Sequence, residues 1–263
     1  MVSDIGVPYC FRGKGPEISV MMSSNEALDL LRGLRSNPEH AFRCGYAVLE
    51  GEKIIRQAVA AGYAFDALAG TSSDASFVPT CELSEHELAD LIGFRPHSPL
   101  IGLVRVPDAV DIDAVVFPAV ALEGVSDAAN VGAIVRTAVG LGIRTIITDS
   151  ASSHPFLRRA VRTSMGACFR IAHARVDHLA SAIGDLTAEG RITIAMEQCP
   201  QSIPCAEVIG GVDVLALGNE GAGCSAALLR SVTHVAEIPM AMPDMSLNVA
   251  AAAAIGMHAL FVR

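Results

Sequence analysis

Apolar residues follow two different spacings in the first hundred residues of the chain. In some stretches they recur every three or four positions, as in a helix that buries one face, and in others they form the short runs typical of buried strands. The spacing predicts helices at residues 24–34, 50–61 and 85–91, and strands at residues 46–49, 67–71, 77–79 and 100–106. This alternation predicts a small α/β domain over residues 20–106, preceded by an irregular extension at residues 1–19.

Two of these predicted helices carry signals at their ends. Ser84 is followed three residues later by Glu87, which is the capping box that begins many helices. Gly62 follows the predicted helix at residues 50–61, and glycine readily adopts the left-handed conformation that ends helices. Both signals support the helix boundaries.

Buried-type apolar runs alternate with helical stretches in the second half of the chain. Residues 107–113, with one proline and three aspartates, are interpreted as a linker before this half. Near-continuous apolar runs separated by helices are typical of a parallel sheet covered on both faces. The predicted strands lie at residues 114–122, 144–148, 167–173, 192–195, 212–217 and 235–238, and a last helix begins at Ser246. The pattern thus predicts a larger α/β domain over residues 114–263.

The chain is acidic overall, with 19 Lys and Arg against 28 Asp and Glu and a net charge of −9. This balance excludes a protein that holds nucleic acid with its whole surface. Residues 136–175, however, contain seven arginines and one acid, so this segment carries +6. Arg158, Arg159 and Arg162 cluster within it and suit a polyphosphate partner. The alternative is an ordinary solvated basic face.

Neither the cysteines nor the apolar stretches indicate a secreted or membrane protein. The seven cysteines include no CxxC pair, so no zinc site or disulfide framework is expected, and they are interpreted as small buried residues in a reducing cytoplasm. The start of the chain lacks the apolar core of a secretion signal. The longest apolar stretch, residues 249–262, is shorter than a membrane span, so it predicts a buried helix. We expect a cytoplasmic protein without membrane or metal partners.

A first group of residues suited to chemistry follows the predicted strand at 114–122 and begins a helix. Ligands of open parallel sheets gather at the carboxyl ends of the strands. Asp127 or Asn130 can cap this helix, and Gly132 permits a close approach of backbone or ligand. Arg136 shares a helix face with small residues, where it can meet a pocket or a partner. A plain surface arginine is equally consistent with the spacing.

A second group is the glycine-rich turn at residues 217–223, which follows another predicted strand. Such a turn brings backbone N–H groups against a ligand. Glu220 within it can accept a hydrogen bond from a ligand hydroxyl or orient Arg136. The turn has neither the dinucleotide fingerprint nor the Lys-Ser/Thr pair of a P-loop. Taken alone, it is more commonly a glycine turn with a solvated acid.

A third group lies at residues 238–249, where a strand ends and a proline-bounded loop precedes the last helix. Ser246 is well suited to cap that helix. Asn248 is a poor residue for a helix interior, so its presence predicts a specific hydrogen bond.

Together these groups resemble the motifs of the SpoU family of RNA ribose 2′-O-methyltransferases, within the SPOUT superfamily. The matching residues are Asn130-x-Gly132-x-x-x-Arg136, Arg162-Thr-Ser164-Met-Gly166-Ala167, Gly218-x-Glu220-x-x-Gly223, Ile238-Pro-Met240 and Ser246-Leu247-Asn248-Val249. The match covers residues 114–263, and residues 24–106 resemble the substrate-binding domain that precedes the catalytic domain in longer members. The departures, such as Ala128 in place of a proline, remove no polar residue that the chemistry needs.

The resemblance implies a C-terminal parallel-sheet SPOUT domain with a deep trefoil knot, preceded by a small α/β RNA-binding domain. It implies S-adenosylmethionine as cofactor, a homodimer, and RNA as substrate, with rRNA favoured over tRNA because an N-terminal domain is present. The implied catalytic residues are Asn130, Arg136, Glu220, Ser246 and Asn248. The implied cofactor-binding residues are Met196, Gly218, Asn219, Gly223, Ile238, Met240 and Leu247. The charge pattern assigns RNA binding to Arg158, Arg159 and Arg162, and Lys53 and Arg56 of the N-terminal domain are the further candidates for RNA contacts.

Two other functions compete with this one. A non-catalytic RNA-binding scaffold of the same fold has no need of the complete set of polar motif residues. A dehydrogenase requires a dinucleotide fingerprint, and Gly140-Leu-Gly142 lies after a helix and before a strand, the reverse of the required order. Binding of S-adenosylmethionine separates the three possibilities.

Overall fold

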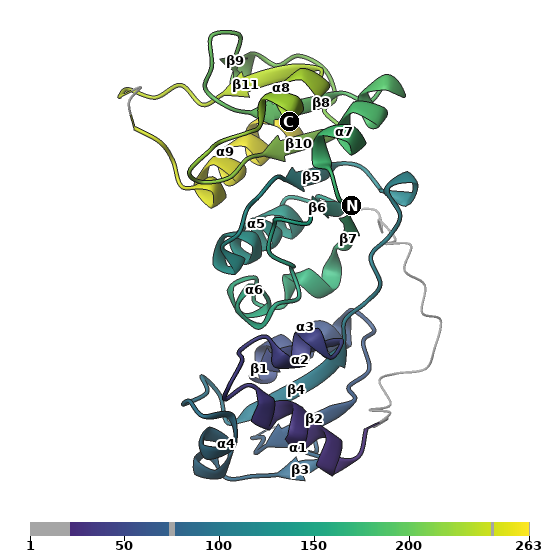
Figure 1. Cartoon of the computed structure of the whole chain (residues 1–263), viewed down its shortest axis with the longest axis vertical. Coiled ribbons are helices and arrows are strands. Elements are labelled where there is room, and N and C mark those ends of the chain that lie inside the picture. The colour runs from purple at the N-terminus through teal and green to yellow at the C-terminus, as the bar shows by residue number, and fades with distance from the viewer. Residues whose placement is uncertain (1–21, 74–76, 243–244, 263) are drawn as a thin grey trace, which may run out of the picture.

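The computed structural model describes residues 22–73, 77–242 and 245–262, which form two sheets covered by helices (Figure 1). We call the elements α1 to β4 the four-stranded unit and the elements β5 to α9 the seven-stranded unit. In Figure 1 the four-stranded unit lies below the seven-stranded unit, with α6 facing it.

The four-stranded unit has the strand order β1-β4-β2-β3. Strands β1 and β2 run antiparallel to β4, and β3 runs parallel to β2. Successive side chains of β1 alternate between two cores, with Tyr46 and Val48 in one and Ala47 and Leu49 in the other. The helices are α1 (Ser24–Gly33), α2 (His40–Arg43), α3 (Glu52–Ala60) and α4 (Glu85–Ile92), and the strands are β1 (Tyr46–Glu50), β2 (Ala67–Gly70), β3 (Cys81–Glu82) and β4 (Leu100–Arg105).

The seven-stranded unit is a parallel sheet with the order β7-β6-β5-β10-β8-β11-β9. Its strands are β5 (Ala119–Leu122), β6 (Thr145–Thr148), β7 (Ala172–Arg175), β8 (Thr193–Met196), β9 (Ile203–Pro204), β10 (Val214–Leu217) and β11 (His234–Glu237). Its α-helices are α5 (Ala128–Gly140), α6 (Arg158–Thr163), α7 (Leu179–Ala188), α8 (Ala226–Ser231) and α9 (Val249–Phe261). Helices α5 and α9 share a core with one face of the sheet, and α7 and α8 cover the other. The predicted parallel sheet covered on both faces is therefore confirmed.

The helix-end signals are also confirmed. The Ser84 hydroxyl accepts a hydrogen bond from the Glu87 N–H at 3.3 Å, and the Glu87 carboxylate accepts one from the Ser84 N–H at 2.8 Å. Gly62 has a φ of 87°, as a residue that ends a helix in the left-handed conformation does.

Several predicted strand boundaries are wrong, because apolar runs do not distinguish strands from apolar turns and loops. Residues 77–79 form no strand: Val78 is 70% exposed, and the strand is Cys81–Glu82 instead. The prediction for 114–122 is too long, since Ile112–Ala114 is a 3-10 turn and the strand begins after Pro118, which has no N–H to donate. Residues 167–173 begin with a 3-10 turn, Ala167–Arg170, and only then enter β7.

Two predicted helix starts are also wrong. The helix predicted at 50–61 begins at Glu52, because Glu50 belongs to β1 and its side chain is buried. The last helix begins at Val249 rather than at Ser246, and Asn248 caps it by accepting a hydrogen bond from the Ala250 N–H. The predicted extension at residues 1–19, with Cys10, lies outside the described residues.

The two units pack directly against each other. Residues of α3 and β1 belong to the same hydrophobic core as residues of α5 and α6. Across the junction Tyr63 packs edge-on against Phe169, with ring centroids 4.9 Å apart, and Phe42 lies 4.8 Å from His154. The segment at residues 107–113 therefore joins two units that already share buried surface.

Two predicted absences can be examined only for the described part of the chain. None of its helices is both long enough and apolar enough to cross a membrane. No three His, Cys, Asp or Glu side chains within it are grouped so as to hold a metal ion. The six cysteines that it includes are free thiols.

Candidate active site

The carboxyl ends of four neighbouring strands bring the three sequence motifs to one edge of the sheet. Leu217, at the end of β10, pairs in register with Leu122 of β5 and with Met196 of β8. Met196 in turn pairs with Ala236 of β11. The loops that follow β5, β10 and β11 carry the first, second and third motifs. Three segments far apart in the sequence therefore meet where parallel sheets commonly bind ligands.

Three polar side chains, one from each motif, form a hydrogen-bonded chain. The Asn248 amide donates to Asn130 Oδ1 at 3.1 Å, and the Asn130 amide donates to Glu220 Oε1 at 2.7 Å. At the other end, Asn248 Oδ1 accepts from the Ala250 N–H at 2.9 Å, which fixes the orientation of both amides. The hydrogen bond predicted for Asn248 is therefore present. Asn130 therefore joins the Glu220 carboxylate, 90 positions away along the chain, to Asn248, 118 positions away.

Arg136 lies apart from this chain. It is exposed on α5, and no side-chain hydrogen bond, ion pair or ring contact joins it to the rest of the chain that the structure describes. Glu220 thus orients Asn130 rather than Arg136 in this chain. The guanidinium of Arg136 remains available to a partner molecule, as the spacing on the helix allowed.

The turn of the second motif is built on two glycines. A Cβ on Gly218 would lie 2.2 Å from the carbonyl carbon of Gly223 and 2.3 Å from the nitrogen of Cys224, so only glycine permits the chain to fold back here. Gly223 has a φ of 69°, and its own Cβ would lie 2.3 Å from the Glu197 carboxylate. Gly218 is thus required by the close approach of backbone, and Gly223 by its positive φ and by the Glu197 carboxylate beside it.

Asn219 ties this turn to the first motif. Its amide donates to the Gly124 carbonyl at 2.7 Å, and its Oδ1 accepts from the N–H groups of Gly221 and Ala222 at 2.8 and 3.0 Å. Its side chain is therefore occupied within the protein. Any contact of Asn219 with a cofactor would come from its backbone.

The remaining predicted cofactor residues lie on the same edge. Met196 is buried at the end of β8, and Ile238 and Met240 are half-buried just beyond β11. Leu247 is 36% exposed and Ser246 is exposed, both in the loop before α9. Ser246 makes no side-chain hydrogen bond to a described residue, so the chain of Asn248, Asn130 and Glu220 does not include it.

Three carboxylates that hold these loops were missed by the sequence analysis. Glu123 accepts hydrogen bonds from the Ser225 N–H and hydroxyl, both at 2.8 Å. Asp149 is buried and accepts from the N–H groups of Gly124 and Ser152 at 3.1 and 2.8 Å. Glu197 accepts from the Cys224 N–H at 2.7 Å. Each acid directly follows a buried strand, and that position was the signal available in the sequence.

Cys224 does not supply a nucleophile to this site at neutral pH. Burial, together with the nearby carboxylates of Glu197 and Glu123, raises the pKa of the Cys224 thiol to about 12. The thiol therefore stays protonated, and the chemistry of the edge belongs to its amides, carboxylates and Arg136.

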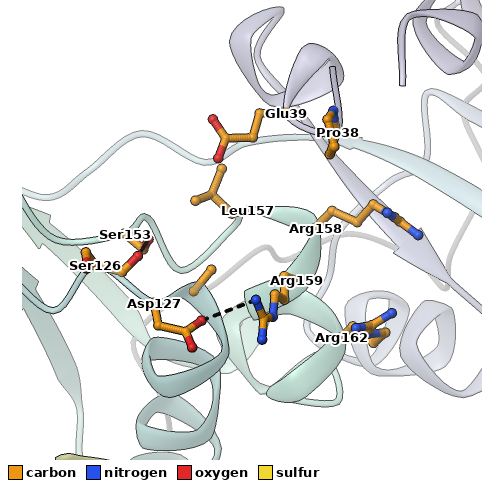
Figure 2. A pocket seen from close by; sticks show the side chains of 10 residues that line it. Pro38, Glu39, Ser126, Asp127, Ser153, Leu157, Arg158, Arg159 and Arg162 are labelled. Carbon is orange, nitrogen blue, oxygen red and sulfur yellow. Dashed lines mark hydrogen bonds and ion pairs between the residues drawn. The ribbon is translucent and has the colours of Figure 1, made fainter. Parts of the chain in front are cut away.

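A cavity of about 500 Å³ lies at the junction of the two units, beside the start of α5 (Figure 2). Its lining residues are Pro38, Glu39, Ser126, Asp127, Ala128, Ser153, Leu157, Arg158, Arg159 and Arg162. The three arginines predicted to bind RNA are thus brought together at one cavity. Lys53 and Arg56, the other two, are exposed on α3 and do not line it.

A family model described as the SpoU rRNA Methylase family matches residues 118–258, which is more than half of the chain. The chain belongs to the SpoU rRNA methylase family. The resemblance predicted from the motifs is confirmed, and the match spans the hydrogen-bonded residues Asn130, Glu220 and Asn248. The fold of this family implies the trefoil knot predicted above.

Relatives of this SpoU family member include RNA methyltransferases. An uncharacterized tRNA/rRNA methyltransferase of Mycobacterium tuberculosis, Rv0881, is 30% identical over 250 residues, which cover 88% of this chain and 87% of the relative. The 23S rRNA (guanosine(2553)-2′-O)-methyltransferase RlmP of Bacillus subtilis is 35% identical over 124 residues, 46% of this chain and 48% of its own. We conclude that the protein is an RNA methyltransferase of the SpoU family.

The fold extends over both units of this family member. The crystal structure of an AdoMet-bound rRNA methyltransferase from Sinorhizobium meliloti superposes with a TM-score of 0.74 and covers 91% of this chain and 95% of that one, at 24% identity. The four-stranded unit and the seven-stranded unit are therefore both part of a known architecture.

Proposed function

We propose that the protein transfers the methyl group of S-adenosylmethionine to a ribose 2′-hydroxyl of RNA, with rRNA as the favoured substrate over tRNA. The observation that carries this proposal is the chain of hydrogen bonds from Asn248 through Asn130 to Glu220. Arg136, on the same helix as Asn130, has no side-chain bond to a described residue and stays available to the RNA. A scaffold that only binds RNA has no use for side chains held in this way. The 2′-O chemistry and the rRNA preference are supported by RlmP, which is named for both.

The turn at Gly218 and Gly223 fits the cofactor. A Cβ on Gly218 would displace the backbone of the turn, and a Cβ on Gly223 would displace the Glu197 carboxylate that holds it. The apolar side chains of Met196, Ile238 and Leu247 surround the same edge and suit the adenine ring. The Sinorhizobium protein of this fold is AdoMet-bound. S-adenosylmethionine supplies an electrophilic methyl group, so the protein's own task is to place the acceptor oxygen in line with it.

The polar residues divide the rest of this task. Arg136 holds its proton too tightly to act as a ready base, so we assign it to the phosphate and the developing charge of the target nucleotide. Glu220 presents a carboxylate whose direction is set by Asn130, and it is suited to accept a hydrogen bond from the ribose hydroxyl. Asn248 bonds to Asn130 from the third motif, and we assign it and the exposed Ser246 to the polar shell around the nucleotide.

The surface of α9 supports a homodimer. This helix contains no charged residue apart from the titratable His258, and one face of it is buried through Val249, Ala253 and Met257. On the other side Ile255 remains 43% exposed. Because a helix that is apolar on all sides is normally buried, we propose that a second copy of the chain covers this face. We also propose that the protein forms this dimer and methylates RNA in the cytoplasm.

Ile255→Asp is expected to convert the dimer to a monomer, because a carboxylate at this position would be buried without a partner. Sedimentation equilibrium measures the change, and Val78→Asp is the matched control, since Val78 is 70% exposed and lies in the four-stranded unit. A wild-type protein that sediments as a monomer would contradict the assignment.

Two measurements test the proposed function. Calorimetry is expected to show one S-adenosylmethionine bound per chain, which a scaffold or a dehydrogenase would not show. Mapping of 2′-O-methyl groups in RNA from a strain that lacks the gene is expected to reveal one missing rRNA methyl group. A loss confined to tRNA would overturn the rRNA preference, and an unchanged map would overturn the ribose assignment.

A further inference from the structure

The three neighbouring arginines of α6 have different surroundings. Arg158 reaches into the four-stranded unit, where its Nε donates to Glu50 Oε1, a carboxylate whose side chain is only 1% exposed. Its guanidinium carbon also lies 4.0 Å from the centroid of the Phe94 ring. Both the charge and the flat face of Arg158 are therefore occupied by residues of the other unit.

Arg159 and Arg162 are differently placed. The Arg159 side chain is 61% exposed and lies 3.6 Å from Asp127. Arg162 Nη1 lies 2.5 Å from His97 Nε2, at the rim of the four-stranded unit. Figure 2 shows Arg159 turned toward Asp127 in the cavity, whereas Arg158 extends away from it. The cavity also contains the carboxylate of Glu39, so its charge is mixed and the two arginines carry its positive side.

The contact of Arg158 with Glu50 closes one side of a packed junction. Gly166, just beyond α6, lies so close to α3 that a Cβ on it would be 3.1 Å from Gln57 Cβ. Glu50, the partner of Arg158, also accepts a hydrogen bond from the His97 N–H at 3.4 Å, and the His97 ring is the partner of Arg162. The walls of the cavity come from both units, and this network fixes the distance between them.

We propose that Arg158 is a positioning residue that holds the four-stranded unit against the seven-stranded unit. Arg159 and Arg162 are then the arginines of α6 that contact phosphates of the RNA. The proposal rests on the proposed function, because it assigns the RNA to the cavity. Removal of Arg158 leaves the buried Glu50 carboxylate without its cation, which loosens the junction. RNA binding then weakens because the site is no longer preorganised, not because a phosphate contact is lost.

The salt dependence of RNA binding separates the two roles. Each phosphate contact that is lost makes the slope of log K against log salt shallower by about one unit. Arg159→Gln/Arg162→Gln is expected to bind RNA more weakly with a slope shallower by about two units. Arg158→Gln is expected to bind RNA about tenfold more weakly with an unchanged slope, because only preorganisation is lost. Its kcat at saturating RNA should stay near the wild-type value while its KM for RNA rises.

Proteolysis reports on the junction itself. In Arg158→Gln the segment at residues 107–113 should be cleaved faster than in the wild type, because the units separate more often. Glu50→Gln should reproduce this effect, and the double variant should be no worse than either single one, since both remove one contact. Arg158→Lys, which keeps the charge without the planar stacking on Phe94, should fall between wild type and Arg158→Gln.

Arg191→Gln is the matched control. Arg191 likewise lies beside a carboxylate, 3.6 Å from Asp213, and over an aromatic ring, 4.4 Å from the centroid of Phe117, but within the seven-stranded unit. The Arg191→Gln variant should change neither RNA affinity nor cleavage of residues 107–113.

The affinity for S-adenosylmethionine should be unchanged in every variant. A wild-type protein that does not bind S-adenosylmethionine would contradict the proposed function rather than this proposal.

Two results would overturn the proposal. A slope that becomes shallower by about one unit in Arg158→Gln would make Arg158 an RNA ligand. An unchanged slope in Arg159→Gln/Arg162→Gln would place the RNA elsewhere, with Lys53 and Arg56 the next candidates. Should Arg158→Gln fail to fold, Glu50→Gln and Arg158→Lys give the same tests.

Discussion

Arg136→Ala is expected to lower the rate of methyl transfer by about a hundredfold to a thousandfold, the range seen when a single charge-stabilising donor is removed from an active site. Arg136 is exposed, and its side chain is bonded to no other residue that the structure describes. Its loss should therefore leave the fold and the cofactor site intact. Single-turnover methylation of RNA under saturating S-adenosylmethionine measures the effect.

Arg136→Lys distinguishes shape from charge at the same position. A planar guanidinium forms two parallel hydrogen bonds to a phosphate, which an ammonium does not, so the lysine variant should also be slow. Calorimetry should show S-adenosylmethionine affinity within about twofold of wild type in both variants, because Arg136 is not among the residues assigned to the cofactor. Near-normal turnover of Arg136→Lys would show that only the charge matters. Loss of cofactor affinity in Arg136→Ala would move this residue to the cofactor site.

Gly218→Val is expected to have the largest effect on cofactor binding. Its Cβ would lie 2.2 Å from the backbone of Gly223, so the turn of the second motif must shift. Overpacking of this kind costs about 1–3 kcal/mol, and if the binding-competent turn bears that cost, S-adenosylmethionine binds about fivefold to about 150-fold more weakly. Gly218→Ala places the same Cβ and should show most of the loss. Calorimetry measures the affinity.

Gly211→Ala is the control for this prediction, because a Cβ there meets no atom within 4 Å and no positive φ is required. It should bind the cofactor as the wild type does. Thermal unfolding of Gly218→Val should remain cooperative, since the change is confined to a turn at the end of β10. Unchanged cofactor affinity in a folded Gly218→Val would place the cofactor away from this turn.

The sequence was sufficient to predict the architecture, but not the exact boundaries of several helices and strands. Periodicity was sufficient for the parallel sheet, because strands buried on both faces give unmistakable apolar runs. It failed at residues 77–79 and 114–118, because a loop beside a proline can be as apolar in sequence as a strand. It also placed the start of the last helix at Ser246 rather than at the true cap, Asn248, since both are good capping residues. Only the hydrogen bonds of Asn248 to Ala250 and Asn130 identify the cap.

The candidate site, too, was only partly predictable from the sequence. The motif residues Asn130, Glu220 and Asn248 were found in the sequence, but the order in which they bond depends on three loops meeting in space. Of the two roles considered for Glu220, accepting from a ligand hydroxyl and orienting Arg136, the second is not seen in this chain, where its carboxylate accepts from Asn130. Arg158 could not be separated from Arg159 by sequence, since they are neighbours of the same type. Only the fold shows that a helix turns one of them toward Glu50 of the other unit.

Product analysis tests the central claim most directly. The purified protein is incubated with S-adenosylmethionine that carries a labelled methyl group and with unmodified rRNA, and the RNA is then digested to nucleosides and examined by mass spectrometry. The account predicts the label on the ribose of one nucleoside, as a 2′-O-methyl group, with no transfer by Arg136→Ala on the same timescale. Label on a base, or bound cofactor without transfer to any RNA, would contradict it.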